Sequence, residues 1–151
     1  MNAAAQFIKA KFPAEVVEVV EFRGDDTVVV KPGRIKDILT ALRDDENLSF
    51  KYLSMVTAID YSPASPRFAL VYNLYSHKNH DRITLKAFCE DDSSPVIDSV
   101  FPVFSTADWH EREAYDLMGI RFKGHPNLKR ILMPDDFVGH PLRKEYPIRG
   151  E

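Results

Sequence analysis

The residues best suited to chemistry in this sequence are His110 and Glu111. A helical His-Glu-x-x-His motif places two imidazoles one turn apart around a zinc ion, with the glutamate as general base. Ala114 stands where the second histidine is needed, so the motif is broken. The other histidines are spread over loop-like segments: His77, His80, His125 and His140. A small metal-dependent enzyme that uses His110, Glu111 and a loop histidine is a remote alternative.

Other catalytic signatures are missing from the sequence. It has no glycine-rich nucleotide-binding motif and no Gly-x-Ser-x-Gly nucleophile elbow. Cys89 is the only cysteine, and a single thiol supplies neither a disulfide nor the ligand set of a zinc or iron–sulfur site. We expect a structural role for Cys89 in a reducing compartment. No catalytic residue, bound cofactor or metal ligand is expected in this chain.

Charged residues dominate the segment from Trp109 to Asp116, which lacks a continuous apolar stripe. Arg112 and Asp116 are four residues apart and are predicted to pair along a helix. Some of the remaining charges are expected to meet cations outside the helix. A salt-bridged surface helix and a docking helix covered by a partner or by the tail both explain this pattern.

The elements that must position these residues begin with five β-rich segments. β-branched and alternating residues predict strands at 16–22, 27–30, 50–60, 67–76 and 82–90. A turn at Gly24-Asp25-Asp26 joins the first two, and the last three are joined by links too short for a crossover helix. The predicted fold class is therefore α+β, a two-layer domain with a mostly antiparallel sheet covered by helices.

Two helices are expected in the first third of the chain. One lies within the opening dozen residues and stops before Pro13. The other carries apolar residues at i, i+3, i+4 and i+7, namely Ile35, Ile38, Leu39 and Leu42.

A third helix is predicted from about Thr106 to Met118. Ser105 and Asp108 are placed to form a capping box at its start, and Gly119 to end it in the left-handed conformation. A short helix is also expected at 96–100.

The sequence changes character after Gly119. Four of the six glycines and four of the ten prolines fall in the last 33 residues, which is incompatible with long regular elements. Apolar residues nevertheless recur there at short intervals. We therefore divide the chain into an α+β globular domain, 1–118, and an extended strap, 119–151, laid across its own domain or a partner.

Composition narrows the class of protein further. A chain of 151 residues with 44% hydrophobic and 28% charged residues is typical of one folded domain. A formal net charge of −3 argues against nucleic acid as a partner. No run of about 18 apolar residues is present, so any membrane association is expected to be peripheral.

Read as one string, Trp109 to Gly150 resembles the C-terminal signature of the C subunit, the thirty-kilodalton subunit, of respiratory complex I. The matching parts are, in order, Glu111-Arg112-Glu113, Asp116-Leu117-Met118, His125-Pro126, Lys129-Arg130-Ile131-Leu132, Pro134-Asp135-Asp136 and Gly139-His140-Pro141-Leu142-Arg143-Lys144-Glu145-Tyr146-Pro147. Phe137 and Glu145 stand where the family usually has Trp and Asp. The printed sequence ends four residues after Pro147, so a separate polypeptide is expected rather than a fusion to the D subunit of the complex.

The resemblance implies a cofactor-free structural or assembly subunit in the hydrophilic arm of a proton-translocating NADH:quinone oxidoreductase (NADH dehydrogenase). It would pack against the D subunit, whose interface with the B subunit forms the quinone pocket. FMN, iron–sulfur clusters and quinone would be held by neighbouring subunits. The expected location is peripheral, on the cytoplasmic face of a bacterial inner membrane. The equivalent subunit of a related hydrogenase or other-donor dehydrogenase is an alternative, and a free-standing binding module is a third reading.

The resemblance also implies which residues fix the strap and its partner contacts. They are Glu111, Arg112, Glu113, Asp116, His125, Arg130, Asp135, Asp136, His140, Arg143 and Tyr146. If Arg143 pairs across a subunit interface, Arg143→Ala should weaken assembly and leave the melting temperature of the isolated chain nearly unchanged.

Overall fold

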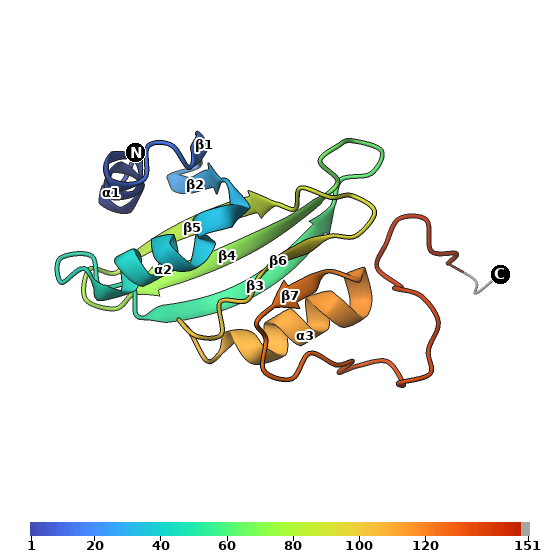
Figure 1. Cartoon of the computed structure of the whole chain (residues 1–151). Coiled ribbons are helices and arrows are strands. Elements are labelled where there is room, and N and C mark those ends of the chain that lie inside the picture. The colour runs from blue at the N-terminus through green and yellow to red at the C-terminus, as the bar shows by residue number, and fades with distance from the viewer. Residues whose placement is uncertain (149–151) are drawn as a thin grey trace.

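The computed structural model describes residues 1–148 (Figure 1). Five strands form one sheet in the order β1-β2-β5-β4-β3, and two short strands, β6 and β7, form a second sheet. The strands are β1 (Val16–Phe22), β2 (Asp25–Val30), β3 (Tyr52–Asp60), β4 (Phe68–Ser76), β5 (Asp81–Phe88), β6 (Val96–Asp98) and β7 (Arg121–Lys123). The helices are α1 (Ala3–Lys11), the 3-10 turn η1 (Pro32–Arg34), α2 (Ile35–Asp44) and α3 (Ala107–Met118). The predicted α+β class is confirmed.

The sheet is mixed, which the short connections did not predict. β3, β4 and β5 form the expected antiparallel meander, but β2 pairs with β5 in parallel, from Thr27 opposite Thr84 to Val30 opposite Ala87. The reason is that α2 carries the chain across the sheet between β2 and β3. The meander then returns and places β5 beside β2 in the same direction.

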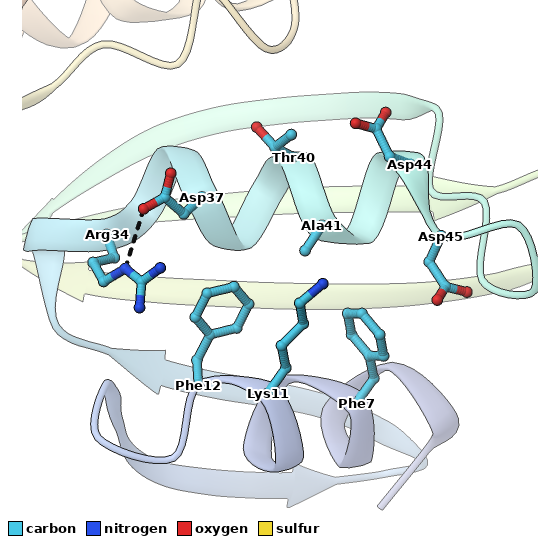
Figure 2. Close-up of a pocket in the computed structure, with 9 residues that line it drawn as sticks. All are labelled: Phe7, Lys11, Phe12, Arg34, Asp37, Thr40, Ala41, Asp44 and Asp45. Carbon is cyan, nitrogen blue, oxygen red and sulfur yellow. Dashed lines mark hydrogen bonds and ion pairs between the residues drawn. The ribbon is translucent and has the colours of Figure 1, made fainter.

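Helix α2 follows the predicted apolar stripe closely. Helix α2 lies across the sheet (Figure 1). The four residues of its apolar stripe are fully buried: Ile35, Ile38, Leu39 and Leu42. Helix α1 lies beside α2, and Phe7, Lys11 and Phe12 point toward α2 (Figure 2). One continuous core joins α1, α2, α3 and the sheet.

The expected short helix at 96–100 is wrong. Residues Val96–Asp98 are strand β6, which pairs in parallel with β7, the strand that follows α3. A β-strand, α3 and a second β-strand therefore form one β-α-β unit. The partner strand lies more than twenty positions away, so local propensity could not reveal it.

The ends of α3 differ in how well they were predicted. The predicted capping box is wrong. Thr106 is the N-cap of α3, and its side chain makes no capping hydrogen bond. Ser105 contributes only its carbonyl, which accepts from the Asp108 N–H at 3.2 Å. Gly119 is confirmed as a left-handed C-cap, with a φ of 74°. The β1–β2 turn is also shifted, because Arg23 and Gly24 have the positive φ angles, 52° and 83°.

Cys89 is fully buried at the end of β5. Burial raises the pKa of its thiol to about 12, so it is protonated at neutral pH. A buried, protonated thiol fits the structural role expected for it. Within residues 1–148, no helix is long and apolar enough to span a bilayer.

Candidate functional site

The candidate site is the anchorage of the strap, which runs past the end of α3 and along one end of the five-stranded sheet (Figure 1). Regular structure in residues 119–148 is confined to β7. The rest is held in place by polar contacts to two groups of residues, one at the C-terminal end of α3 and one where β3 ends and β4 begins.

Asp116 is the centre of the first group. Its carboxylate is fully buried and accepts at Oδ1 from Arg130 Nη1 at 2.7 Å. Oδ2 accepts from the consecutive backbone N–H groups of Ile131, Leu132 and Met133, at 3.1, 2.7 and 2.9 Å. Consecutive N–H groups that converge on one point form an anion-binding concavity. The strap thus wraps its backbone around a carboxylate supplied by the helix.

The protonation state of Asp116 follows from these contacts. Burial by itself raises the pKa of the carboxyl. The N–H groups of Met133 and Leu132, together with Arg130, outweigh burial, so the pKa lies below its usual value. Asp116 is therefore ionised when it holds the strap.

Arg130 closes the next segment of the strap into a loop. Its Nη2 donates to the carbonyls of Phe137 and Gly139, at 2.9 and 3.0 Å. The Phe137 ring stacks on Tyr146, with ring centroids 6.1 Å apart. Arg130 therefore joins α3, through Asp116, to the segment from Phe137 to Gly139.

The C-terminal carbonyls of α3 are satisfied by the strap. The last carbonyls of a helix lack partners within it. Here the Asp116 carbonyl lies 3.0 Å from His140 Nδ1, and the Met118 carbonyl accepts from Arg143 Nε at 2.7 Å. The Leu142 N–H donates to the Leu117 carbonyl at 3.0 Å. The strap caps the helix that anchors it.

Gly119 makes this close approach possible. A Cβ at this position would lie 2.6 Å from both Arg143 Nη2 and His140 Cδ2. The positive φ and the lack of a side chain are therefore both needed here.

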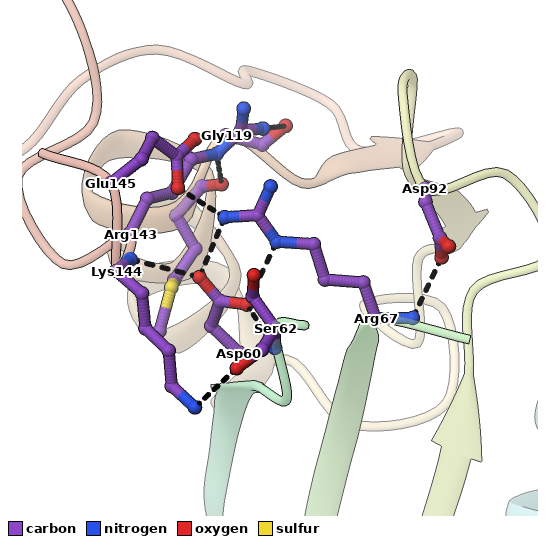
Figure 3. Close-up of polar contacts among 9 residues, drawn as sticks. Asp60, Ser62, Arg67, Asp92, Gly119, Arg143, Lys144 and Glu145 are labelled. Atoms are coloured by element: carbon purple, nitrogen blue, oxygen red, sulfur yellow. Dashed lines mark hydrogen bonds and ion pairs between the residues drawn. The ribbon is translucent and has the colours of Figure 1, made fainter. Parts of the chain in front are cut away.

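The second group joins the strap to the sheet (Figure 3). Arg67 donates to both carboxylate oxygens of Asp60, each at 2.8 Å, and also pairs with Glu145. The Lys144 N–H donates to Asp60 Oδ2 at 2.9 Å, and Lys144 Nζ donates to the Ser62 carbonyl at 2.8 Å. The Arg67 guanidinium holds the pKa of Asp60 well below its usual range, against the opposing effect of burial. This group fixes the second end of the strap.

Sequence reasoning missed Asp60, Arg67 and Ser62, because they lie outside the signature. The available signal was weak: Asp60 ends one predicted strand and Arg67 begins the next. Nothing in the sequence indicated that residues 144 and 145 would meet them, across more than seventy positions.

Two predicted residues of α3 behave differently from expectation. The pairing of Arg112 with Asp116 is wrong: Arg112 donates instead to the carbonyls of Lys129 and Arg130, at 3.1 and 2.9 Å. Asp116 does meet a cation outside its helix, as expected for this segment. Glu111 is fully buried and accepts from Ser99 Oγ and from the Val100 N–H.

The other predicted site residues differ in whether their side chains are buried or exposed. The His125 side chain is buried, with Nε2 2.9 Å from Asp108 Oδ1. Three acidic residues are exposed and make no side-chain hydrogen bond or ion pair with the described residues: Glu113, Asp135 and Asp136. Most of the signature therefore holds the strap to its own domain, and a partner role for individual residues stays a prediction.

The residues of the metal-site alternative are not brought together. His110 lines a small cavity of about 30 Å³ with Glu113 and Leu142, whereas Glu111 is bonded to Ser99 and Val100. In the part of the chain that the structure describes, no three His, Cys, Asp or Glu side chains are grouped to hold a metal ion.

Comparison with known proteins places this sequence in a family. The model described as "Respiratory-chain NADH dehydrogenase, 30 Kd subunit" matches residues 28–151. A protein from Citrifermentans bemidjiense, named as the C subunit of NADH-quinone oxidoreductase, is 51% identical over 99% of this chain and 91% of its own length. Proteins of the same name from Geobacter sulfurreducens and Roseiflexus sp. are 49% and 44% identical, over 99% and 95% of this chain and 91% and 82% of their own.

Proposed function

The chain belongs to the family of the 30 kDa subunit of respiratory-chain NADH dehydrogenase, and we propose that it is the structural C subunit of a bacterial NADH:quinone oxidoreductase. In this role it contributes no catalytic group and no cofactor of its own. It packs against the D subunit in the hydrophilic arm, while FMN, iron–sulfur clusters and quinone are held by neighbouring subunits. It is held at the cytoplasmic face of the inner membrane through the complex.

One observation carries this proposal: polar contacts to its own domain fix the strap backbone, while three of the strap's apolar side chains face outward. Leu132 is 60% exposed, Val138 87% and Leu142 56%, although the strap backbone around them is fixed by Asp116 and Arg143. Exposed apolar side chains on a fixed backbone are typical of an interface, because little conformational entropy is lost when a partner covers them. Scattered apolar residues on a mobile tail would not have this property.

The proposal is tested by making the outward surface polar without touching the anchors. A tagged chain carrying Leu132→Ser and Val138→Ser is expressed in its native host, membranes are solubilised gently, and co-purifying proteins are identified by mass spectrometry. We expect recovery of the flavin-, cluster- and quinone-site subunits to fall at least severalfold, with the melting temperature of the isolated chain unchanged. Phe22→Ser, at an exposed apolar position on β1, is the matched control.

Two results would contradict the proposal. If the double variant recovers the partner subunits as well as the wild type does, the exposed strap surface is not part of the interface. Recovery of a nickel–iron hydrogenase large subunit with the wild-type chain would keep the scaffold role and change the electron donor.

A further inference from the structure

Glu111 differs from the other buried carboxylates of the strap region in having no cation. Asp60 is paired with Arg67 and Asp116 with Arg130. Glu111 is 0% exposed, yet within residues 1–148 it forms no ion pair. Among the described residues, the Glu111 carboxylate accepts hydrogen bonds only from Ser99 Oγ, at 2.5 Å, and from the Val100 N–H, at 2.9 Å. A buried carboxylate without a cation is costly when ionised.

Within residues 1–148, the charges that act on Glu111 and Tyr72 come from acids and a thiol, and the buried His125 side chain is bonded to Asp108 rather than to Glu111. Its own helix contributes Asp108, whose charge disfavours ionisation of Glu111. On β4, the buried Tyr72 hydroxyl has no hydrogen-bond partner among the described residues and lies within electrostatic reach of Glu111. Asp98 of β6 and Cys89, which follows β5, lie within electrostatic reach of Tyr72. The acids, the thiol and the phenol are each neutral or negative.

Burial raises the pKa of Glu111 to about 7, against the opposing hydrogen bonds from Ser99 and Val100. Burial likewise raises the pKa of Tyr72, which stays a neutral phenol. Glu111 is thus the group of this cluster that changes charge near neutral pH.

We propose that Glu111 and Ser99 form a buried proton-binding site between α3 and the segment that follows β6, and that proton occupancy links the packing of α3 to pH. A proton taken up from solvent neutralises the Glu111 carboxylate, and Ser99 Oγ lies within hydrogen-bond distance of the resulting carboxyl group. Ser99 Oγ also accepts from the Phe101 N–H at 3.1 Å, which holds it in place in either state. Because α3 carries Asp116, the charge on Glu111 acts on the helix that anchors the strap.

The first test is an infrared titration of the full chain, which follows the carbonyl stretch of protonated carboxyl groups. We expect one carboxyl to lose its proton with a midpoint near neutral pH in the wild type and in Glu113→Gln, the exposed control on the same helix. That titration should be missing in Glu111→Gln. If all carboxyl absorption is lost in the ordinary glutamate range, around pH 4.3, the site does not exist.

Two further variants keep the test decisive if Glu111→Gln fails to fold. Ser99→Ala removes a bond that favours the charged form, so the midpoint should rise. Asp108→Asn removes a nearby negative charge, so the midpoint should fall. Unchanged midpoints, or shifts of the opposite sign, would overturn the proposal.

The link to packing has its own readout. The folded pKa of Glu111 is above its unfolded value, so its contribution to stability is present at low pH and lost as pH rises through the folded pKa. The melting temperature of the wild type should therefore fall between pH 5 and 8, and the melting temperature of Glu111→Gln should fall less. Parallel pH profiles of the two proteins would contradict the link.

Discussion

Arg130 and Asp116 form a buried ion pair, 2.7 Å from Nη1 to Oδ1, that joins the strap to the last turn of α3. The same arginine reaches the Phe137 and Gly139 carbonyls, and the same aspartate receives three backbone N–H groups of the strap. The two residues together therefore organise the loop between 131 and 139.

Asp116→Ala should destabilise the chain strongly. It leaves the Arg130 guanidinium and three backbone N–H groups without their acceptor, and breaking a buried pair costs about 3–5 kcal/mol of unfolding free energy. Urea unfolding of the isolated chain measures the loss, and limited proteolysis should show faster cleavage between 131 and 139. Asp135→Ala, at an exposed acid of the same loop, is the control. Equal stability of the two variants would exclude the anchoring role.

Arg143→Ala should lower the melting temperature of the isolated chain, which reverses the expectation from the sequence. Arg143 donates to the Met118 carbonyl, and its guanidinium lies 4.9 Å from the centre of the buried Phe68 ring. Leaving that carbonyl unpaired and losing the packing should cost about 1–3 kcal/mol. Arg121→Ala on β7 is the matched exposed control. An unchanged melting temperature for Arg143→Ala would contradict this role and favour contacts of Arg143 across the subunit interface.

Gly119→Ala should disturb both the end of α3 and the strap. The left-handed conformation alone costs a non-glycine residue roughly 1–2 kcal/mol, and the new methyl group would collide with Arg143 and His140. Thermal melts should show the loss, with Gly33→Ala as the control, since a Cβ there meets no atom within 4 Å. Equal melting temperatures for the two variants would mean that the strap accommodates the new methyl group without loss of stability.

Asp60 should make the chain sensitive to acid. Because Arg67 lowers its folded pKa, its contribution to stability is present above the unfolded pKa of about 3.8 and is lost as pH falls below that value. Asp60→Asn should therefore be less stable than wild type at pH 6 and lose less on acidification. Urea unfolding across this range measures both effects, with Asp136→Asn, at an exposed acid that forms no ion pair with the described residues, as the control. An unchanged acid dependence in Asp60→Asn would contradict this assignment.

The acid effect and the effect of Glu111 have opposite signs. Asp60 adds stability as pH rises through the acid range, whereas Glu111 removes stability as pH rises towards 7. The two can therefore be separated by pH alone.

Residue types and their spacing predicted most of the helices and strands, and the family. The apolar stripe from Ile35 to Leu42 specifies a helix because its spacing matches the helical period, and the meander follows from short links. Gly119 marks the end of α3 because only glycine adopts that conformation at low cost. The order and spacing of the signature residues were also readable directly, since they need no knowledge of contacts.

Which polar groups meet became clear only from the folded chain. Local spacing favoured Arg112 as the partner of Asp116, yet the folded chain brings Arg130 to it and leaves Arg112 to cap carbonyls of the strap. The pairing of β6 with β7 and the approach of Lys144 to Asp60 likewise join segments far apart in sequence. Hydrogen bonds depend on the positions of backbone groups after folding, and backbone N–H groups like those that hold Asp116 occur in every sequence. The residue pattern therefore did not show that the proline-rich tail would bond to the end of α3 and leave Leu132, Val138 and Leu142 exposed.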